Sequence, residues 1–269
     1  MPELLGSWEL IEPLATSERA LLFRARPAGS PADTPCDYVV KTARPDSHAT
    51  ALRFLAREAL ACRTVSHAHV VSVLAMHLKT APPWLVMPYL GSTNLATRLD
   101  QPSTWSLRQS VWVARQTAEG LAALHTAGWL HGDVKPENIM VGPEGHATLI
   151  DLGFARRLGT RECAAGSPLL GTPSFAAPER LDESSPVTAA ADIYSLGVTL
   201  RQMLDLLPPA RRDDSWPHAG PSPEAATRQL VEQMLQRDPL RRPTAPQVRD
   251  ALTGMELSLL ASGATGNVA

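Results

Sequence analysis

The amino-acid sequence predicts an α+β fold with two lobes, a small β-rich N-lobe that contains one helix and a larger α-helical C-lobe. Short aromatic and branched runs fill about the first 90 residues, whereas apolar residues at helical spacing dominate the remainder. Strands followed by helices are typical of α+β proteins, and a cleft between lobes commonly binds a ligand. The polar break GSTN at 91–94 is the expected linker. We therefore expect one domain with an N-lobe at 1–90, a C-lobe at 91–256 and a C-terminal tail at 257–269.

The N-lobe is predicted to contain five strands and one helix. Runs of aromatic and branched residues between turn formers predict strands at 8–14, 20–26, 37–41, 70–76 and 84–90. The stretch at 49–64 is rich in strong helix formers and predicts a single amphipathic helix. The apolar residues that we expect on its buried face are Leu52, Leu55, Ala59 and Leu60.

Helical periodicity dominates the C-lobe. The predicted helices are 107–127, 190–206, 224–236 and 246–260. In the first of them, Val111, Ala114, Ala118 and Leu121 fall on one face. This pattern predicts helices that bury one side against each other.

Composition excludes several classes of protein. With 27 acidic residues against 25 Lys and Arg, the chain lacks the charge of a nucleic-acid or anionic-membrane binder. No apolar run reaches the roughly 18 residues that a transmembrane helix needs. Glu3, Glu9, Glu12 and Glu18 stand where a secretion signal would be basic and then apolar. We therefore expect a cytoplasmic protein with no membrane segment and no nucleic-acid partner.

The sequence HGDVKPEN at 131–138, followed by Asp151 in a DLG triplet, has the side chains that phosphoryl transfer needs. That reaction requires metal ions, a cation on the phosphates and an acceptor for the substrate's hydroxyl proton. Asp133 can orient and deprotonate the hydroxyl, and Lys135 can reach the transferred phosphate. Asn138 and Asp151 offer oxygen ligands to Mg²⁺.

Two further residues complete this set of roles. Lys41 ends a predicted strand, and Glu58 projects from the predicted helix at 49–64. An ion pair between them would hold the Lys41 amine against the phosphates of a nucleotide. We therefore expect all of these side chains to converge on one magnesium-bound triphosphate.

These residues belong to motifs that occur in a fixed order along the chain. The motifs are YVVK at 38–41, REALACRTVSHAHVV at 57–71, LVMPYL at 85–90, HGDVKPEN at 131–138, DLG at 151–153, GTPSFAAPE at 171–179, DIYSLGVTL at 192–200 and RDPLRRPT at 237–244. Each motif alone is unspecific, but their joint order and spacing are not. In this respect residues 8–254 resemble a eukaryotic-type Ser/Thr protein kinase catalytic domain, similar to those found in bacteria.

The resemblance implies a two-lobed protein-kinase-like fold and an ATP-dependent enzyme that phosphorylates a Ser or Thr hydroxyl of a protein. It implies ATP and Mg²⁺ or Mn²⁺ as cofactors, with Met87 as the gatekeeper and the backbone of Pro88 and Leu90 at the adenine edge. The ATP-binding residues that it implies are Ala15, Ser17, Ala20, Leu22, Val39, Lys41, Glu58, Met87, Pro88 and Leu90. The structural residues that it implies are His131, Asp192 and the pair Glu179 and Arg242.

The phosphate-covering loop departs from the family's G-x-G-x-x-G pattern. Aligned on FRAR at 23–26, the three glycine positions carry Ala15, Ser17 and Ala20. Each added Cβ restricts positive φ and close approach of the backbone to phosphate. We therefore expect nucleotide binding that is weaker or differently shaped.

Gly132 is a second departure, because many family members carry an Arg there that pairs with a phosphorylated activation segment. Without this guanidinium, a phosphate on the segment loses its usual counter-charge. The candidate phosphosites are Thr160, Ser167, Thr172 and Ser174. Our hypothesis is that activity does not depend strongly on phosphorylation of this segment.

Two alternative functions remain open. Small-molecule phosphotransferases of the aminoglycoside and choline kinase kind share the HGD motif, but Lys135, the long segment from Asp151 to Glu179 and the RRPT sequence favour a protein kinase. A catalytically weak pseudokinase that acts as a scaffold is favoured by the missing glycines. The pseudokinase alternative is opposed by the presence of all the expected reacting residues, which are Lys41, Glu58, Asp133, Asn138 and Asp151.

Overall fold

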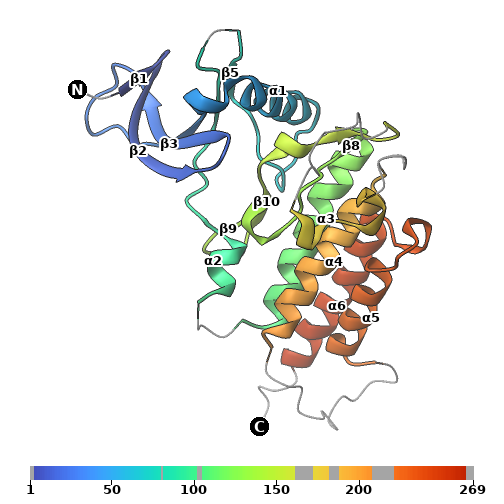
Figure 1. The fold of residues 1–269 in the computed structure, drawn as a ribbon. Coiled ribbons are helices and arrows are strands. Elements are labelled where there is room, and N and C mark those ends of the chain that lie inside the picture. Colours follow the sequence, from blue (N-terminus) through green and yellow to red (C-terminus); the bar gives the residue numbers. More distant parts are fainter. Residues whose placement is uncertain are drawn as a thin grey trace. The chain divides into compact units, whose positions relative to one another are not determined.

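The computed structural model describes residues 3–79, 81–101, 105–160, 172–181, 188–207 and 221–264 (Figure 1). These residues form two units. The first runs to Gly91 and includes Asp151–Ala155, and the second comprises Ser92–Ile150 and the residues from Arg156 onward. The first unit is a sheet with one long helix and the second is mainly helical, which confirms the predicted α+β class.

An antiparallel six-stranded sheet forms the centre of the first unit, with strand order β1-β2-β3-β4-β6-β5. Figure 1 shows that this sheet is strongly curled. The elements are β1 (Glu3–Leu5), β2 (Trp8–Thr16), β3 (Ala20–Pro27), β4 (Tyr38–Ala43), helix α1 (His48–Thr64), β5 (Ala75–His77) and β6 (Trp84–Pro88). One core cluster of the sheet consists of Leu10, Ala25, Val40, Trp84 and Val86.

Helix α1 packs on this sheet through a narrower stripe than its sequence predicts. Ala51, Leu55 and Ala59 are buried beside Leu85 of β6, and their spacing of four keeps them on one face. Leu60 is 53% exposed, so its prediction as a buried residue is wrong. It follows Ala59 directly and therefore points about 100° away from the buried stripe.

The strand predicted at 70–76 is mostly absent. Only Ala75–His77 forms β5, which pairs with β6. Val70 and Val71 are buried in irregular backbone ahead of it. The apolar run therefore indicated buried residues. A short apolar run does not show whether such residues also pair as a strand.

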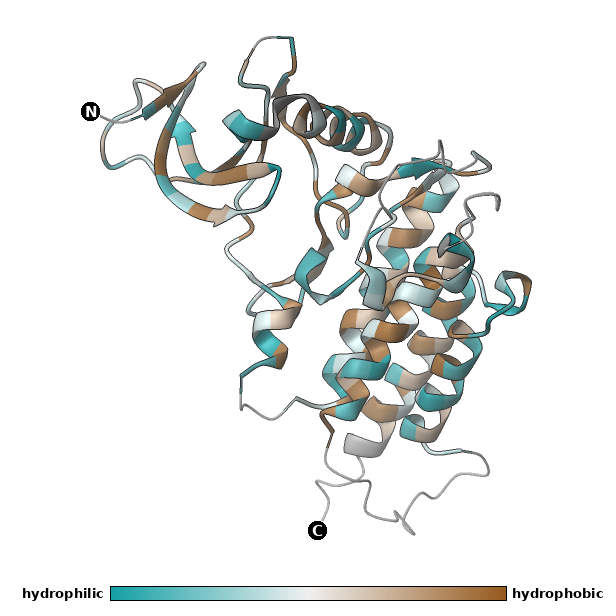
Figure 2. Ribbon diagram, in the orientation of Figure 1, coloured by the Kyte–Doolittle hydropathy of each residue, from teal (hydrophilic) through white to brown (hydrophobic). Residues whose placement is uncertain are grey.

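The second unit contains five helices within the described ranges. They are α2 (Leu95–Leu99), α3 (Leu107–Thr126), α4 (Ala190–Asp205), α5 (Pro223–Met234) and α6 (Ala245–Ala264). Helices α3, α4, α5 and α6 pack against one another, and Figure 2 shows apolar and hydrophilic residues alternating along them. Ser106 begins α3 with a capping box to Gln109, which explains where this long helix starts.

Helix α6 continues to Ala264, past residue 256, where we expected a tail to begin. Leu257, Leu259, Leu260 and Ala261 are good helix formers, so nothing in the local sequence ends the helix at 256. Within the described ranges, no helix combines the length and the apolar character needed to cross a bilayer.

The predicted motif HGDVKPEN lies between short strands of the second unit. The strands are β7 (Thr93–Asn94), β8 (Trp129–Leu130), β9 (Ile139–Val141), β10 (Ala147–Leu149) and β11 (Arg156–Arg157). They form a three-stranded sheet, β10-β9-β7, and a two-stranded sheet, β11-β8. The sequence HGDVKPEN begins directly after β8 and ends where β9 begins, so strands fix both ends of this loop.

Candidate active site

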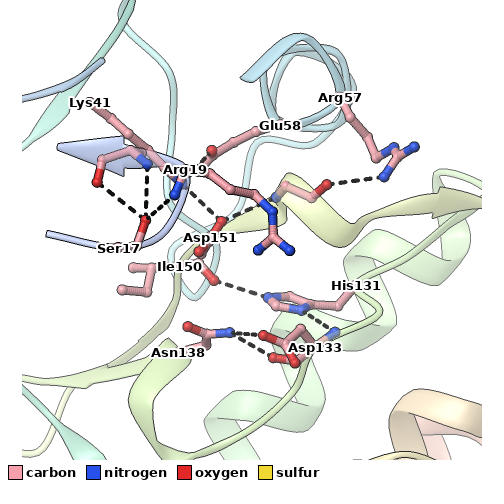
Figure 3. A network of polar contacts seen from close by, with 12 residues as sticks. Ser17, Arg19, Lys41, Arg57, Glu58, His131, Asp133, Asn138, Ile150 and Asp151 are labelled. Carbon is pink, nitrogen blue, oxygen red and sulfur yellow. Dashed lines mark hydrogen bonds and ion pairs between the residues drawn. The ribbon is translucent and has the colours of Figure 1, made fainter. Parts of the chain in front are cut away.

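Three charged side chains meet inside the first unit. The Lys41 Nζ atom on β4 donates to Glu58 Oε2 on α1 at 2.7 Å and to Asp151 Oδ1 at 2.8 Å (Figure 3). These residues are far apart in sequence, and the strand, the helix and the DLG segment bring them together. One ammonium therefore bridges two carboxylates.

Electrostatics keep this lysine charged. Burial alone would lower the pKa of Lys41, but the neighbouring Asp151 and Glu58 carboxylates outweigh it and raise the pKa. The Glu58 side chain is 1% exposed, whereas that of Asp151 is 38% exposed. The three groups carry a formal charge of −1, so a further cation is attracted to the exposed carboxylate of Asp151.

The backbone at Asp151 has the left-handed conformation, with φ 60° and ψ 71°. Aspartate adopts this region more readily than most residues, and the Gly153 N–H stabilises it by donating to Asp151 Oδ1 at 3.3 Å. A Cβ at Gly153 would lie 3.1 Å from that oxygen and 3.2 Å from a Phe54 ring carbon. A side chain at this position would therefore need the Asp151 carboxylate or the Phe54 ring to shift by a few tenths of an ångström.

A second cluster surrounds Asp133 inside the second unit. Asn138 Nδ2 donates to Asp133 Oδ2 at 2.9 Å and to the Asp133 carbonyl at 2.8 Å. Lys135 Nζ lies 3.0 Å from Asp133 Oδ2 and donates to Thr172 Oγ1 at 2.6 Å. The Thr172 N–H donates to Asp133 Oδ1 at 2.8 Å. Both oxygens of Asp133 are therefore oriented by neighbours, and the carboxylate is held in one rotamer.

Asp192, near the start of α4, accepts hydrogen bonds from the backbone of the loop at 131–138. Its Oδ2 accepts from His131 N at 2.8 Å and its Oδ1 from Gly132 N at 2.9 Å. The His125 ring nitrogen lies 2.9 Å from Oδ2. Burial opposes ionisation of Asp192, but these hydrogen bonds, that of His125 foremost, keep its pKa below the ordinary value. Gly132 has φ +85°, a conformation that glycine adopts without strain.

Two further contacts stabilise the loop at 131–138 and the segments near it. His131 Nε2 lies 3.1 Å from the Ile150 carbonyl, and its side chain is fully buried. Arg242 donates to both oxygens of Glu179 at 2.6 and 2.7 Å, which is the pair expected from the sequence. The Arg242 side chain has no exposed surface, so its guanidinium forms this bidentate pair out of contact with water.

Five of the residues expected to bind ATP lie on adjacent strands of the first unit or directly after them. Leu22 on β3 is opposite Lys41 on β4, and Val39 on β4 is opposite Met87 on β6. Val39 and Met87 are 9% and 7% exposed. Pro88 ends β6, and Leu90 follows it as a half-buried residue. These residues therefore lie together, on the strands beside the lysine.

The glycine-free hairpin between β2 and β3 is held by Ser17. Its hydroxyl oxygen accepts from Ala20 N at 3.0 Å and Arg19 N at 3.4 Å, while Ser17 N donates to Ala20 O at 2.9 Å. Of the non-glycine residues described, only Asp151 has positive φ. Ala15, Ser17 and Ala20 therefore adopt this turn without the freedom that glycine would supply.

Sequence reasoning missed several contacts. Thr172 was a candidate phosphosite, yet its hydroxyl accepts from Lys135 and its N–H donates to Asp133. Thr160 Oγ1 donates to the Arg157 carbonyl at 2.6 Å, and Ser174 is exposed. Ser167 lies outside the described residues. The contacts of Thr172 had one signal in the sequence, because Thr172 lies only a few residues before the Ala-Pro-Glu triplet at 177–179. No local pattern, however, identifies Lys135 or Asp133 as its partner.

The Arg180 side chain was also missed. Its Nη1 donates to the Gly132 carbonyl at 2.6 Å, so a guanidinium reaches the very residue at which the sequence lacks one. Arg180 comes directly after Glu179 in the chain, and nothing in that local sequence indicates that its side chain turns toward the catalytic loop.

Comparison with known proteins agrees with this geometry. The model of the protein kinase domain matches residues 29–251. The chain is 40% identical over 149 residues to the serine/threonine-protein kinase PknK of Mycobacterium tuberculosis, an alignment that covers 55% of this chain and 13% of that protein. It is 34% identical over 148 residues to the probable serine/threonine-protein kinase pknA2 of Bifidobacterium longum, covering 55% and 19%. It is 29% identical over 260 residues to the probable serine/threonine-protein kinase PkwA of Thermomonospora curvata, covering 92% and 34%. The alignments therefore cover between 13% and 34% of the length of these relatives.

Proposed function

The chain belongs to the protein kinase domain family, and from this premise we propose that it transfers the γ-phosphoryl group of ATP to a Ser or Thr hydroxyl of a protein. The observation that carries the proposal is the buried Lys41 ammonium bound by both Glu58 and Asp151. Such a cation, fixed beside an exposed carboxylate, suits phosphates and their metal. The relatives named above as serine/threonine-protein kinases support the choice of acceptor.

The residues fit ATP and Mg²⁺ or Mn²⁺ by the chemistry of their donor atoms. Asp151 offers a half-exposed carboxylate. Asn138 uses its amide nitrogen to hold Asp133, so its carbonyl oxygen is the atom left for a metal. These are hard oxygen ligands of the kind that Mg²⁺ prefers, so Asp151 and Asn138 are the residues that would hold the metal. When bound, ATP supplies the phosphoryl group and the metal neutralises charge on its phosphates.

The chain's own residues would then act on the substrate. Asp133 would orient the substrate hydroxyl and accept its proton as the bond from the hydroxyl oxygen to the γ-phosphorus forms and the bond from that phosphorus to the departing ADP oxygen breaks. Lys135, held between Asp133 and Thr172, stabilises charge on the transferred group. Lys41, fixed by Glu58, binds the remaining phosphates. Because each of these side chains is already oriented by neighbours, little reorganisation is needed during transfer.

We further propose that activity does not require phosphorylation of the activation segment. Arg180 Nη1 donates to the Gly132 carbonyl at 2.6 Å, and Thr172 links Lys135 to Asp133. The loop is thus braced by side chains of the chain itself rather than by an arginine that needs a phosphate partner. Phosphatase-treated protein should keep its activity, and a large loss would contradict this part of the proposal.

Two alternatives compete with this function. The internally bonded hairpin at Ser17 favours a weak or inactive kinase that acts as a scaffold. The HGD motif at 131–133 also fits a small-molecule phosphotransferase, although the protein kinase domain match speaks against it.

One experiment separates the three functions. Purified protein is incubated with labelled ATP and Mg²⁺ or Mn²⁺, with a generic acceptor protein or with small amines and sugar alcohols, beside the Asp133→Ala variant. Label on protein that depends on Asp133 supports the kinase. Label on a small molecule supports the phosphotransferase, and nucleotide binding without turnover supports the scaffold.

A further inference from the structure

Arg19 extends from the tip of the β2–β3 hairpin onto two aromatic rings. Its guanidinium carbon lies 4.6 Å from the centroid of the Phe54 ring and 5.6 Å from that of the Phe154 ring. Both distances are within the range of a cation–π contact. The two rings meet edge to face, with centroids 5.0 Å apart and planes at 73°. One arginine therefore contacts an aromatic pair formed by different parts of the first unit.

A second arginine lies near the same pair. The Arg57 guanidinium carbon is 5.7 Å from the centroid of the Phe54 ring, and its Nη1 donates to the Gly153 carbonyl at 3.3 Å. Arg57 thus ties α1 to the DLG segment. Phe54 is therefore held by contacts with both the hairpin and the DLG segment, and it is unlike a lone aromatic on a helix surface.

The aromatic pair lies close in sequence to the carboxylates that bind Lys41. Phe54 precedes Glu58 by one turn of α1, and Phe154 follows Asp151 by three residues. Residues four apart on a helix share a face, so Phe54 and Glu58 project from the same side of α1. Figure 3 shows Arg19, Lys41, Glu58 and Asp151 together. Arg19 thus connects the hairpin to the elements that hold the ion triad of Lys41, Glu58 and Asp151.

The hairpin tip also has backbone hydrogen bonds, because the Arg44 N–H donates to the Arg19 carbonyl at 3.0 Å. The Ser17 hydroxyl accepts from the Arg19 and Ala20 amides, and these hydrogen bonds lie within the turn itself. Glu18, the other charged residue of the turn, is 88% exposed and lies 3.8 Å from the Arg19 guanidinium. So exposed an ion pair contributes little to position. The rings of Phe54 and Phe154 are therefore what Arg19 adds to the turn.

We infer that Arg19 is a positioning residue that pins the hairpin at 16–20 onto Phe54 and Phe154, and so sets where the hairpin meets the nucleotide phosphates. This inference rests on the proposed kinase function for its last step only. In a glycine-rich loop, backbone freedom lets the chain settle onto the phosphates when they bind. Here a side-chain contact fixes the hairpin beforehand, which reduces the ordering cost of binding.

The first test needs no activity. In the nucleotide-free full chain, amide hydrogen exchange of a peptide spanning residues 14–23 is compared between the parent protein and Arg19→Ala. We expect exchange about threefold to tenfold faster in the variant, as loss of a cation–π contact implies. Arg44→Ala is the matched control, because Arg44 lies in the same unit but pairs with the exposed Asp46. Equal exchange in Arg19→Ala and Arg44→Ala overturns the inference.

A double-mutant comparison guards against a merely unfolded variant. Phe54→Leu keeps an apolar side chain of similar bulk on α1 but removes the ring, so it should accelerate exchange in the same peptide. Adding Arg19→Ala to Phe54→Leu should then accelerate exchange by less than Arg19→Ala does in the parent protein, because the contact with Phe54 is already lost and only the longer one with Phe154 remains. Fully additive effects contradict the contact, and the thermal unfolding midpoint of each variant verifies folding.

Kinetics test the last step. Arg19→Ala should raise the KM for ATP about threefold to tenfold and leave kcat within about twofold, because it alters loop position and not the reacting groups. A fall in kcat at unchanged KM overturns a positioning role. If the parent protein transfers no phosphoryl group, the proposed function fails while the exchange experiment still decides the role of Arg19.

Discussion

The β2–β3 hairpin and the loop at 131–138 solve different problems within one catalytic domain. The loop carries the residue types that phosphoryl transfer demands, namely Asp133, Lys135 and Asn138. Each of these side chains is oriented by a hydrogen bond or an ion pair. The hairpin turn at 16–20 contains no glycine, and Ser17 and Arg19 hold it. A reacting carboxylate has no substitute, whereas the shape of a turn can be maintained by several kinds of residue.

The comparisons with known proteins follow the same division. The protein kinase domain match begins at residue 29, after both strands of the hairpin, and it includes the whole catalytic loop. The hairpin therefore lies outside that match, whereas Gly132, the other departure from the family pattern expected from the sequence, lies inside it. The match thus covers the loop that carries the expected reacting groups and leaves out the hairpin, whose shape is held by Ser17 and Arg19.

The largest expected effect comes from removing a member of the ion triad. Asp151→Asn and Lys41→Met should each lower phosphorylation of an acceptor protein by at least about 10³-fold, because the phosphates and metal lose fixed opposite charges. Circular dichroism and thermal unfolding should show an intact fold. Retained turnover in Asp151→Asn would contradict the metal role.

The next effect concerns the proton acceptor. Asp133→Asn should lower kcat by about 10²- to 10⁴-fold, because the amide cannot accept the hydroxyl proton. Binding of ATP, measured by calorimetry, should be retained. A parallel loss of ATP binding would show that the carboxylate is needed for nucleotide affinity, contrary to its assigned role.

A smaller effect is expected at Thr172, which contributes to the order of the catalytic loop. Thr172→Val removes the hydroxyl that Lys135 contacts and should lower kcat about tenfold, the value of one hydrogen bond to a charged group. Thr172→Ser keeps the hydroxyl and is the matched control. Equal activity of the Val and Ser variants would show that this contact has no catalytic weight.

The smallest effect is expected in the hairpin. Ser17→Gly restores one family glycine but removes the hydroxyl that accepts from Ala20 N, so the KM for ATP should change by only about twofold to threefold. Steady-state kinetics at varied ATP measure it. A change as large as that of Asp133→Asn would end the distinction between the two regions.

Local sequence was sufficient for most of the fold. Helices α3, α4 and α5 begin and end within about two residues of the predicted bounds, because caps and periodicity are local signals. The strand predicted at 70–76 and the buried position predicted for Leu60 failed for the opposite reason. Pairing and burial depend on which surface lies opposite, and a short apolar run does not specify that surface.

By itself, the sequence determined which chemical groups the protein carries and the order in which they occur: the lysine at 41, the carboxylates at 58, 133 and 151, and the amide at 138. Only the tertiary structure decided that Thr172 orients Asp133, that Arg180 reaches Gly132, and that Arg19 packs on two rings. Each of these contacts joins segments distant in the chain. Their formation depends on how packed helices and strands align, which no short stretch of sequence encodes.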